Sequence, residues 1–105
     1  MVNEILNKTG LPFKESRFLS PPKSTYAIYN LELDRRGGDD INLVSQYDAT
    51  IELYEYAPDP GAEKTLEEIL DSYGVEFSKD SRYWIDSEQL YQVIYNFSYI
   101  KKGGL

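Results

Sequence analysis

The hydrophobic and polar residues of this chain alternate with a period that changes several times along its 105 residues, and each change predicts an element. Residues 2–9 place Val2, Ile5 and Leu6 on one face at helical spacing. Gly10 follows, and glycine readily takes the left-handed conformation that ends a helix. The pattern therefore predicts a short amphipathic helix over residues 2–9.

Five later stretches alternate with the two-residue period of a strand. The last is the clearest, because Tyr91, Val93 and Tyr95 share one face while Leu90 and Gln92 share the other. Short breaks between strands favour antiparallel neighbours. The stretches are residues 12–18, 24–33, 41–56, 75–79 and 89–100, and the fourth can continue to Trp84 and Ile85.

A second helix is predicted between the third and fourth of these stretches. Asp59 has the side chain of an N-cap, Pro60 suits the first helical position, and Gly74 ends the pattern. The apolar stripe of this helix consists of Ala62, Leu66, Ile69, Leu70 and Tyr73.

Glu63, Glu67 and Asp71 form a second file on the same helix, spaced by four residues. We expect this file to lie on the solvated face opposite the apolar stripe. Carboxylates can catalyse glycosidic chemistry only where their surroundings separate their pKa values. The pattern therefore favours a solvated surface, or an acidic stripe that meets a basic patch on a partner, over a catalytic site.

The order α-β-β-β-α-β-β predicts an α+β fold: a single domain, residues 1–105, with one mainly antiparallel β-sheet and two helices packed on one face. The segment DRRGGDD (34–40) carries both signs of charge and two glycines. We expect a mobile loop over about residues 34–42 and a frayed C-terminal tail over residues 101–105.

The composition removes several classes of function. The chain has no cysteine and no histidine, which excludes disulfides, thiolate metal sites and Ser-His-Asp or Cys-His catalysis within this chain. The net charge of −7 would repel nucleic-acid phosphates. Neither a GxGxxG nor a GxxxxGK[ST] pattern occurs, and no stretch has the length and apolar character of a membrane span. We therefore expect no enzymatic activity and no cofactor.

The loop residues Asp34, Asp39 and Asp40 are a candidate site for calcium or magnesium. They lack the alternating spacing of an EF-hand loop, and Arg35 and Arg36 counter their charge. A connecting loop without metal is the favoured interpretation.

Tyrosine is unusually frequent, with ten residues against one tryptophan and four phenylalanines. Tyrosine combines a large contact area with a polar tip, so it suits strands and interfaces. Tyr83 and Trp84 could stack on a sugar or a base if they were exposed. Packing of Trp84 on the core or at a subunit contact is the favoured interpretation, because large aromatic side chains dominate both.

The order and spacing of four segments resemble those of a family of small proteins encoded in the tail-module genes of long-tailed bacteriophages and prophages. These are the tail terminators, also called tail completion or head–tail joining proteins. The resemblance covers nearly the whole chain and includes no catalytic motif. The segments are TGLPF (9–13), PPKSTYAIY (21–29), ATIELYEYAPDPGAEKTLEEIL (49–70) and WIDSEQLYQVIYNFSYIKK (84–102).

The resemblance implies a non-enzymatic structural protein of the virion that forms a hexameric ring on the head-proximal end of the tail tube. Its partners would be itself, the tail tube protein and the head–tail connector or stopper protein. DNA would pass through the lumen without specific binding, and assembly would take place in the cytoplasm of the host bacterium. The candidate interface residues are Arg35, Arg36, Asp39, Asp40, Glu63, Glu67, Asp71 and Trp84.

Two alternatives remain at this stage. One is a head-completion or stopper protein, which would lie one layer further along the same axis. The other is a monomeric acidic module, a regulator or inhibitor that presents its helix to a basic partner. Ring formation separates the second alternative from the tail terminator, because a monomeric module needs no ring.

Overall fold

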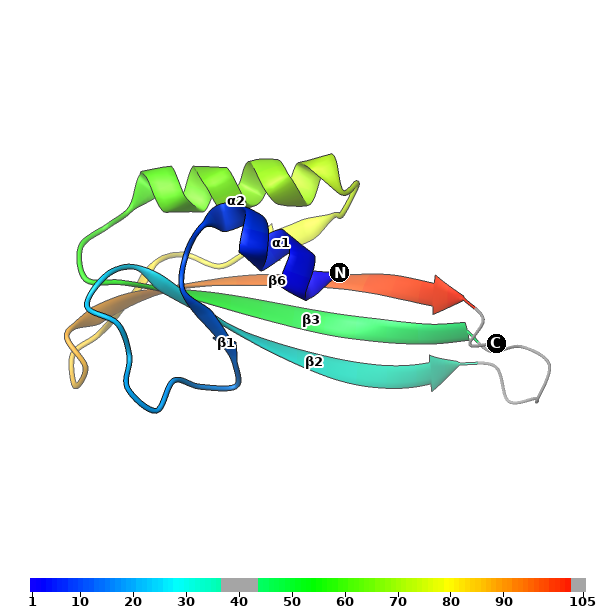
Figure 1. The fold of residues 1–105 in the computed structure, drawn as a ribbon, viewed down its shortest axis with the longest axis horizontal. Coiled ribbons are helices and arrows are strands. Elements are labelled where there is room, and N and C mark those ends of the chain that lie inside the picture. Colours follow the sequence, from blue (N-terminus) through cyan, green and yellow to red (C-terminus); the bar gives the residue numbers. More distant parts are fainter. Residues whose placement is uncertain (37–43, 103–105) are drawn as a thin grey trace.

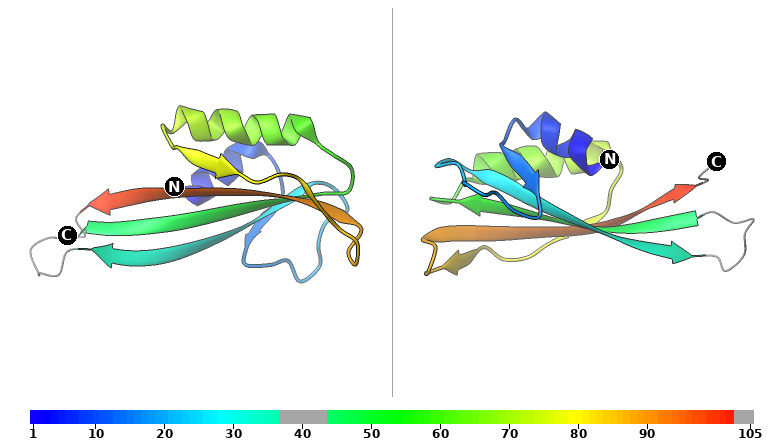
Figure 2. Two further views of the ribbon diagram at one scale, coloured as in Figure 1. Left: turned by 180° about the vertical axis from the view of Figure 1, so that it is seen from behind. Right: turned by 60° about the horizontal axis from the view of Figure 1, so that its bottom comes forward.

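Two helices lie on one face of a six-stranded sheet with the order β1-β2-β3-β6-β4, and β5 also pairs with β6 (Figure 1, Figure 2). The computed structural model describes residues 1–36 and 44–102, apart from the side chains at 34–36, 44 and 102. The predicted α+β class, the mainly antiparallel sheet and the placement of both helices on one face are confirmed.

The elements lie close to the predicted ones. The first helix matches its predicted bounds, and the last strand begins within one residue of its predicted start. In chain order the elements are α1 (Val2–Thr9), β1 (Phe13–Glu15), β2 (Tyr26–Arg36), β3 (Val44–Glu55), α2 (Pro60–Ser72), β4 (Phe77–Lys79), β5 (Tyr83–Ile85) and β6 (Leu90–Lys102).

The strands differ from the sequence patterns in two respects. β1 pairs with β2 in parallel, whereas the other pairs are antiparallel. The region after α2 holds two short strands, β4 and β5, that both pair with β6. Between them the chain leaves the ladder, and Arg82 of this connection forms ion pairs with carboxylates of β3 and α2.

The sheet is longer than predicted at one end. β2 continues through Arg36, which pairs with Val44 of β3, so the first three residues of the expected loop are strand. Lys101 and Lys102 pair with Ser45 and Val44 and belong to β6 rather than to a frayed tail. The remaining positions of the expected loop and tail, 37–42 and 103–105, lie outside the described residues.

The main core lies between the helices and the sheet. The apolar face predicted for α1 is confirmed, and α2 contributes Leu66 and Leu70, which are fully buried. The inward residues of β3 and β6 alternate as predicted, with Ile51 and Leu53 opposite Tyr95 and Val93. A smaller cluster on the other face joins Tyr26, Ile28 and Leu90 with the partly buried Phe18 and Tyr54.

The start of α2 and the end of α1 are each held by the residue predicted for that position. The Asp59 carboxylate accepts a hydrogen bond from the backbone N–H of Ala62 at 3.1 Å and another from the Thr25 hydroxyl at 2.7 Å. Gly10 ends α1 with φ at 76°, where an L-residue would be strained. The start of α2 is therefore fixed both to its own backbone and to the segment before β2.

Candidate assembly surfaces

β2, β3 and β6 extend together beyond both helices as a three-stranded ribbon (Figure 1, Figure 2). We call this part, residues 32–36, 44–48 and 98–102, the distal ribbon. β1 pairs with β2 only at residues 27–29, and β4 and β5 pair with β6 only before the ribbon begins. Within the described part of the chain, no strand pairs with the outer edge of β2 or of β6 in the distal ribbon.

The backbone groups that face these two open edges can be assigned from neighbouring hydrogen bonds. Ala27 N–H donates to Pro12 on the β1 side of β2, and Asp80 N–H donates to the Ile94 carbonyl on the β4 side of β6. Alternate residues of a strand direct their backbone groups to the same side. Leu33 of β2 and Ile100 of β6 therefore direct their N–H and C=O groups to the open edges.

The same two residues are exposed aliphatic side chains, with Leu33 48% and Ile100 62% accessible. Proteins commonly protect unpaired strand edges with charges, prolines or bulges, because an open edge pairs readily with another chain. The two open edges therefore combine one exposed aliphatic residue each with charged neighbours, Glu32, Arg35 and Arg36 on β2 and Lys101 and Lys102 on β6.

The two faces of the distal ribbon differ in character. On the helix side Leu33, Tyr47 and Tyr99 form one row across the three strands, and the two tyrosine rings stack at 5.1 Å. On the opposite side Glu32, Asp48 and Ser98 form the next row, and the Ser98 hydroxyl donates to Asp48 at 2.6 Å. The row on the helix side is thus aromatic and aliphatic, and the row on the other side is polar and acidic, with the exposed Ile100 on that same side.

Two of the predicted interface residues of the loop, Arg35 and Arg36, lie at the end of this ribbon. The backbones of Arg35 and Arg36 pair with Ser45 and Val44 at the end of β2. Asp39 and Asp40 lie outside the described residues. A basic pair of sequence positions therefore lies on the open edge of β2, at the end of the distal ribbon.

The acidic file of α2 does not lie on a solvated face, so that prediction is wrong. Glu63 is only 5% accessible and belongs to the buried side of the helix with Leu66 and Leu70. Glu67 is half-buried and only Asp71 is exposed. Glu63 lies three and seven residues before Leu66 and Leu70, so the three residues share one side of the helix. Its burial is possible because Lys79 and Arg82, from the segment after the helix, neutralise its charge.

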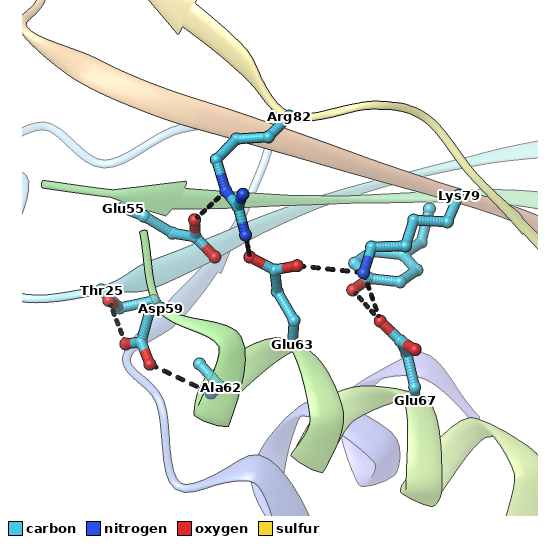
Figure 3. A network of polar contacts seen from close by, with 9 residues as sticks. Thr25, Glu55, Asp59, Ala62, Glu63, Glu67, Lys79 and Arg82 are labelled. Atoms are coloured by element: carbon cyan, nitrogen blue, oxygen red, sulfur yellow. Dashed lines mark hydrogen bonds and ion pairs between the residues drawn. The ribbon is translucent and has the colours of Figure 1, made fainter. Parts of the chain in front are cut away.

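Arg82 joins two of the buried carboxylates (Figure 3). Its Nε donates to Glu55 Oε1 at 3.2 Å, and its Nη2 donates to Glu63 Oε2 at 2.5 Å. Glu55 belongs to β3 and Glu63 to α2, so one guanidinium bridges the sheet and the helix. The sequence patterns did not reveal this role of Arg82. The one sequence feature that points to it is a positively charged residue shortly after a helix rich in glutamate.

Lys79 extends the same network along α2 (Figure 3). Its Nζ lies 3.0 Å from Glu63 Oε1 and 2.7 Å from Glu67 Oε2, and the Tyr95 hydroxyl donates to the same Glu67 oxygen at 2.7 Å. Burial, and then the bond to Glu67, raise the pKa of Tyr95, so its hydroxyl remains a donor. The network ties α2 to β3, β4 and β6.

Glu55 has the most perturbed carboxyl group of the network. It is fully buried, and no donor group of the described residues reaches its Oε2, so this oxygen is the one that can carry a proton and donate it in a hydrogen bond to Glu63. Burial, followed by the hydrogen bond and the charge of Glu63, raises the pKa of Glu55 to about 7. Burial alone would raise the pKa of Glu63 too, but its hydrogen bonds with Glu55, Arg82 and Lys79 together lower that pKa. The proton shared between the Glu55 and Glu63 carboxyl groups is therefore held by Glu55.

Separated pKa values are one requirement of carboxylate catalysis, and access to a substrate is the second. A shallow pocket lined by Lys79 and Arg82 reaches Glu63 but not Glu55. Glu55 is fully buried, and both oxygens of Glu63 are bonded to cations. In the described part of the chain, no group of three or more His, Cys, Asp or Glu side chains is arranged to hold a metal ion. The network is therefore a structural tie between α2 and the sheet.

Trp84 lies on the outer strand β5 and not in the core, so core packing is the wrong interpretation. Trp84 is 39% and its neighbour Tyr83 is 64% accessible. The indole ring lies 4.8 Å from the Tyr91 ring, and its N–H donates to Asp86 at 3.3 Å. A subunit contact through Trp84 stays a prediction.

None of the helices in the described part of the chain combines the length and apolar character needed to cross a membrane.

The fold is found in a solved structure. A chain in the structure of the virion of a native gene transfer agent particle matches with a TM-score of 0.63 and 11% sequence identity, over 94% of this chain and 84% of that chain. No protein-family model and no curated protein matches the sequence. The protein therefore shares its fold, over nearly its whole length, with a chain of a gene transfer agent virion.

Proposed function

We propose that this chain is a non-enzymatic structural protein of a phage-like virion and, within it, a tail terminator. It forms a hexameric ring on the head-proximal end of the tail tube, stops tube growth and joins the tail to the head. The observation that carries the proposal is the fold shared with a chain of a gene transfer agent virion over 94% of this chain. The resemblance of the sequence to tail terminators supports the same conclusion.

The distal ribbon supports assembly into a ring. Its two open edges belong to different strands, so contact between them is heterologous: one surface of each copy meets another surface of the next. Heterologous contacts close into rings when the rotation between copies is a simple fraction of a turn. The backbone groups at both edges of the distal ribbon are left for such a contact, because no described strand pairs with them.

The uncovered face of the ribbon supports a lumen through which DNA passes. The helices occupy one side of the sheet, and a ring with the helices on its outside would turn the row Glu32–Asp48–Ser98 inward. Acidic and hydroxyl groups repel or only weakly contact phosphates, so DNA would slide without binding.

The test is electron microscopy of particles made after deletion of this gene from its source phage, prophage or gene transfer agent. A tail terminator predicts DNA-filled heads beside unjoined tails of abnormal length, with normal particles restored by the wild-type gene. Unjoined tails of normal length beside heads that have lost DNA would instead support the head-completion or stopper protein. Intact joined particles would reject both and leave the monomeric binding module.

A further inference from the structure

We infer that neighbouring copies join by parallel pairing of the distal edge of β2 with the distal edge of β6 of the next copy, with Leu33 opposite Tyr99. This inference rests on the ring of the proposed function and specifies its contact surface. The partner it requires is a second copy of this chain.

The direction of pairing follows from the topology. β2 and β6 are both antiparallel to β3, so they run parallel to each other on the two sides of the ribbon. Copies related by rotation about a ring axis along the strands keep the same strand direction. The β2 edge of one copy therefore meets the β6 edge of the next in parallel, and the closed ring leaves no open edge.

The backbone groups restrict the register to odd-numbered residues of β6 opposite Leu33, and Tyr99 is one of these. In a parallel pair, a residue whose N–H and C=O face the partner bonds to the two residues that flank its opposite number. With Leu33 opposite Tyr99 of the next copy, the Leu33 N–H meets the Ser98 carbonyl and the Leu33 carbonyl meets the Ile100 N–H. The groups that face the two open edges thus satisfy each other, as buried backbone groups require.

The aromatic and aliphatic side chains fit this register, whereas it sets Arg35 opposite Lys101 and Arg36 opposite Lys102, two pairs of like charge that oppose the contact. Leu33 and Tyr99 are already the two ends of one row on the helix side of the ribbon, with Tyr47 between them. In the proposed pairing this row continues from copy to copy, and the Leu33 side chain, 48% accessible here, is covered by the Tyr99 ring of the next copy.

Cysteine cross-linking tests this register, because the chain contains no cysteine. In the double variant Leu33→Cys, Tyr99→Cys the two positions of one copy are two strand spacings apart, about 10 Å, beyond the roughly 7 Å limit of a disulfide. Across the proposed contact they are one spacing apart, about 4.8 Å. Oxidised assemblies should therefore give a ladder of cross-linked multimers, up to the ring size, on non-reducing gels.

Matched control variants distinguish the proposed contact from other contacts between copies. The pair Leu33→Cys, Ile100→Cys introduces the same number of thiols, but on opposite faces of the sheet, and should give no ladder. Dimers from Leu33→Cys alone would show antiparallel contact between two β2 strands and overturn the inference. Rings in electron micrographs whose double variant gives no ladder would also overturn it, while leaving the proposed function intact.

Hydrogen exchange of the wild-type protein keeps the test independent of any substitution. Assembly should slow exchange of the Leu33 and Ile100 amides at least tenfold relative to the monomer, because both face the contact. Equal exchange in rings and monomers would reject edge pairing. A wild-type protein that forms no ring, alone or in particles, would reject both this inference and the tail terminator.

Discussion

At the scale of single residues, Glu55 shows how this small protein balances buried charge. Three carboxylates, Glu55, Glu63 and Glu67, meet only two cations, Lys79 and Arg82, in the network between α2 and the sheet. One proton makes the group neutral, and the buried Oε2 of Glu55, which no donor group of the described residues reaches, is the oxygen that can hold it. The network is therefore stable as a protonated unit.

The pH dependence of stability should reveal this proton. The pKa of Glu55 is about 7 in the folded chain against 4.5 as its ordinary value, so the folded state binds more protons between these limits. The stabilisation is fully present below pH 4.5 and is lost as the pH rises through 7. We expect the free energy of unfolding to fall by on the order of 1–3 kcal/mol across this window, measured by urea unfolding.

Substitution separates Glu55 from the other titrating groups. The Glu55→Gln variant has no titrating group at this position, so it should lose most of the fall in unfolding free energy between pH 4.5 and 7. Glu68→Gln, at an exposed position of α2, should keep the pH dependence of the wild type. The lowered pKa of Glu63 acts below this window, where stability falls as the pH drops. An unchanged slope in Glu55→Gln would show that the proton is held elsewhere.

Leu66 tests the core at the same scale. The side chain is fully buried between α2 and the sheet. Leu66→Ala should cost about 2–5 kcal/mol of unfolding free energy, because it removes apolar contact and leaves a cavity. Urea unfolding measures the loss. The exposed Glu68→Ala change should stay within about 0.5 kcal/mol, and equal losses in both variants would contradict this account of the core.

At the scale of elements, Asp59 links the start of α2 to the segment before β2. Asp59→Ala removes both the helix cap and the acceptor of the Thr25 hydroxyl, so it should cost about 1–2 kcal/mol by thermal or urea unfolding. Asp59→Asn keeps an oxygen acceptor and should retain most of the stability. A variant Asp59→Ala as stable as wild type would mean that neither bond contributes.

The elements that the sequence predicted well are those whose signals are local. The cap residues of both helices and the alternation of β3 and β6 depend only on neighbours in the chain. The parallel pairing of β1 and the division of β4 from β5 could not be predicted in this way. Each of these strands has three residues, and a longer strand from elsewhere in the chain fixes its partner.

The contrast between local sequence signals and contacts from distant segments also explains which predictions for the candidate interface residues were wrong. The file Glu63, Glu67, Asp71 was correct as a spacing but wrong as a solvated face. A glutamate one turn from Leu66 is buried only if cations reach it, and Lys79 and Arg82 come from beyond the end of the helix. The open edges of the distal ribbon depend on strand order, which no local pattern encodes.

At the scale of the whole molecule, the proposed tail-terminator role predicts that the end of the distal ribbon contacts a neighbouring ring or tube. The double change Arg35→Glu, Arg36→Glu should impair head–tail joining while leaving the fold intact, because a basic pair in a chain of charge −7 is suited to acidic groups on a partner. Infectious-particle counts and circular dichroism measure the two effects.

A matched charge reversal serves as control. Lys14→Glu, Arg17→Glu changes the net charge equally, at exposed positions in or beside β1 and away from the distal ribbon. It should leave joining unaffected. Normal particle counts from the Arg35→Glu, Arg36→Glu variant would remove the end of β2 from the contact.

The strand order also determines when the molecule can fold. β6 follows every other strand in the chain, yet it lies in the interior of the sheet beside β3. Until β6 has been made and has left the ribosome, β3 therefore has one edge without its partner, and Ile51 and Leu53 lack the β6 residues that pair opposite them. Nascent chains are prone to wrong pairing during this interval, so faster synthesis of β6 should raise the yield of folded protein.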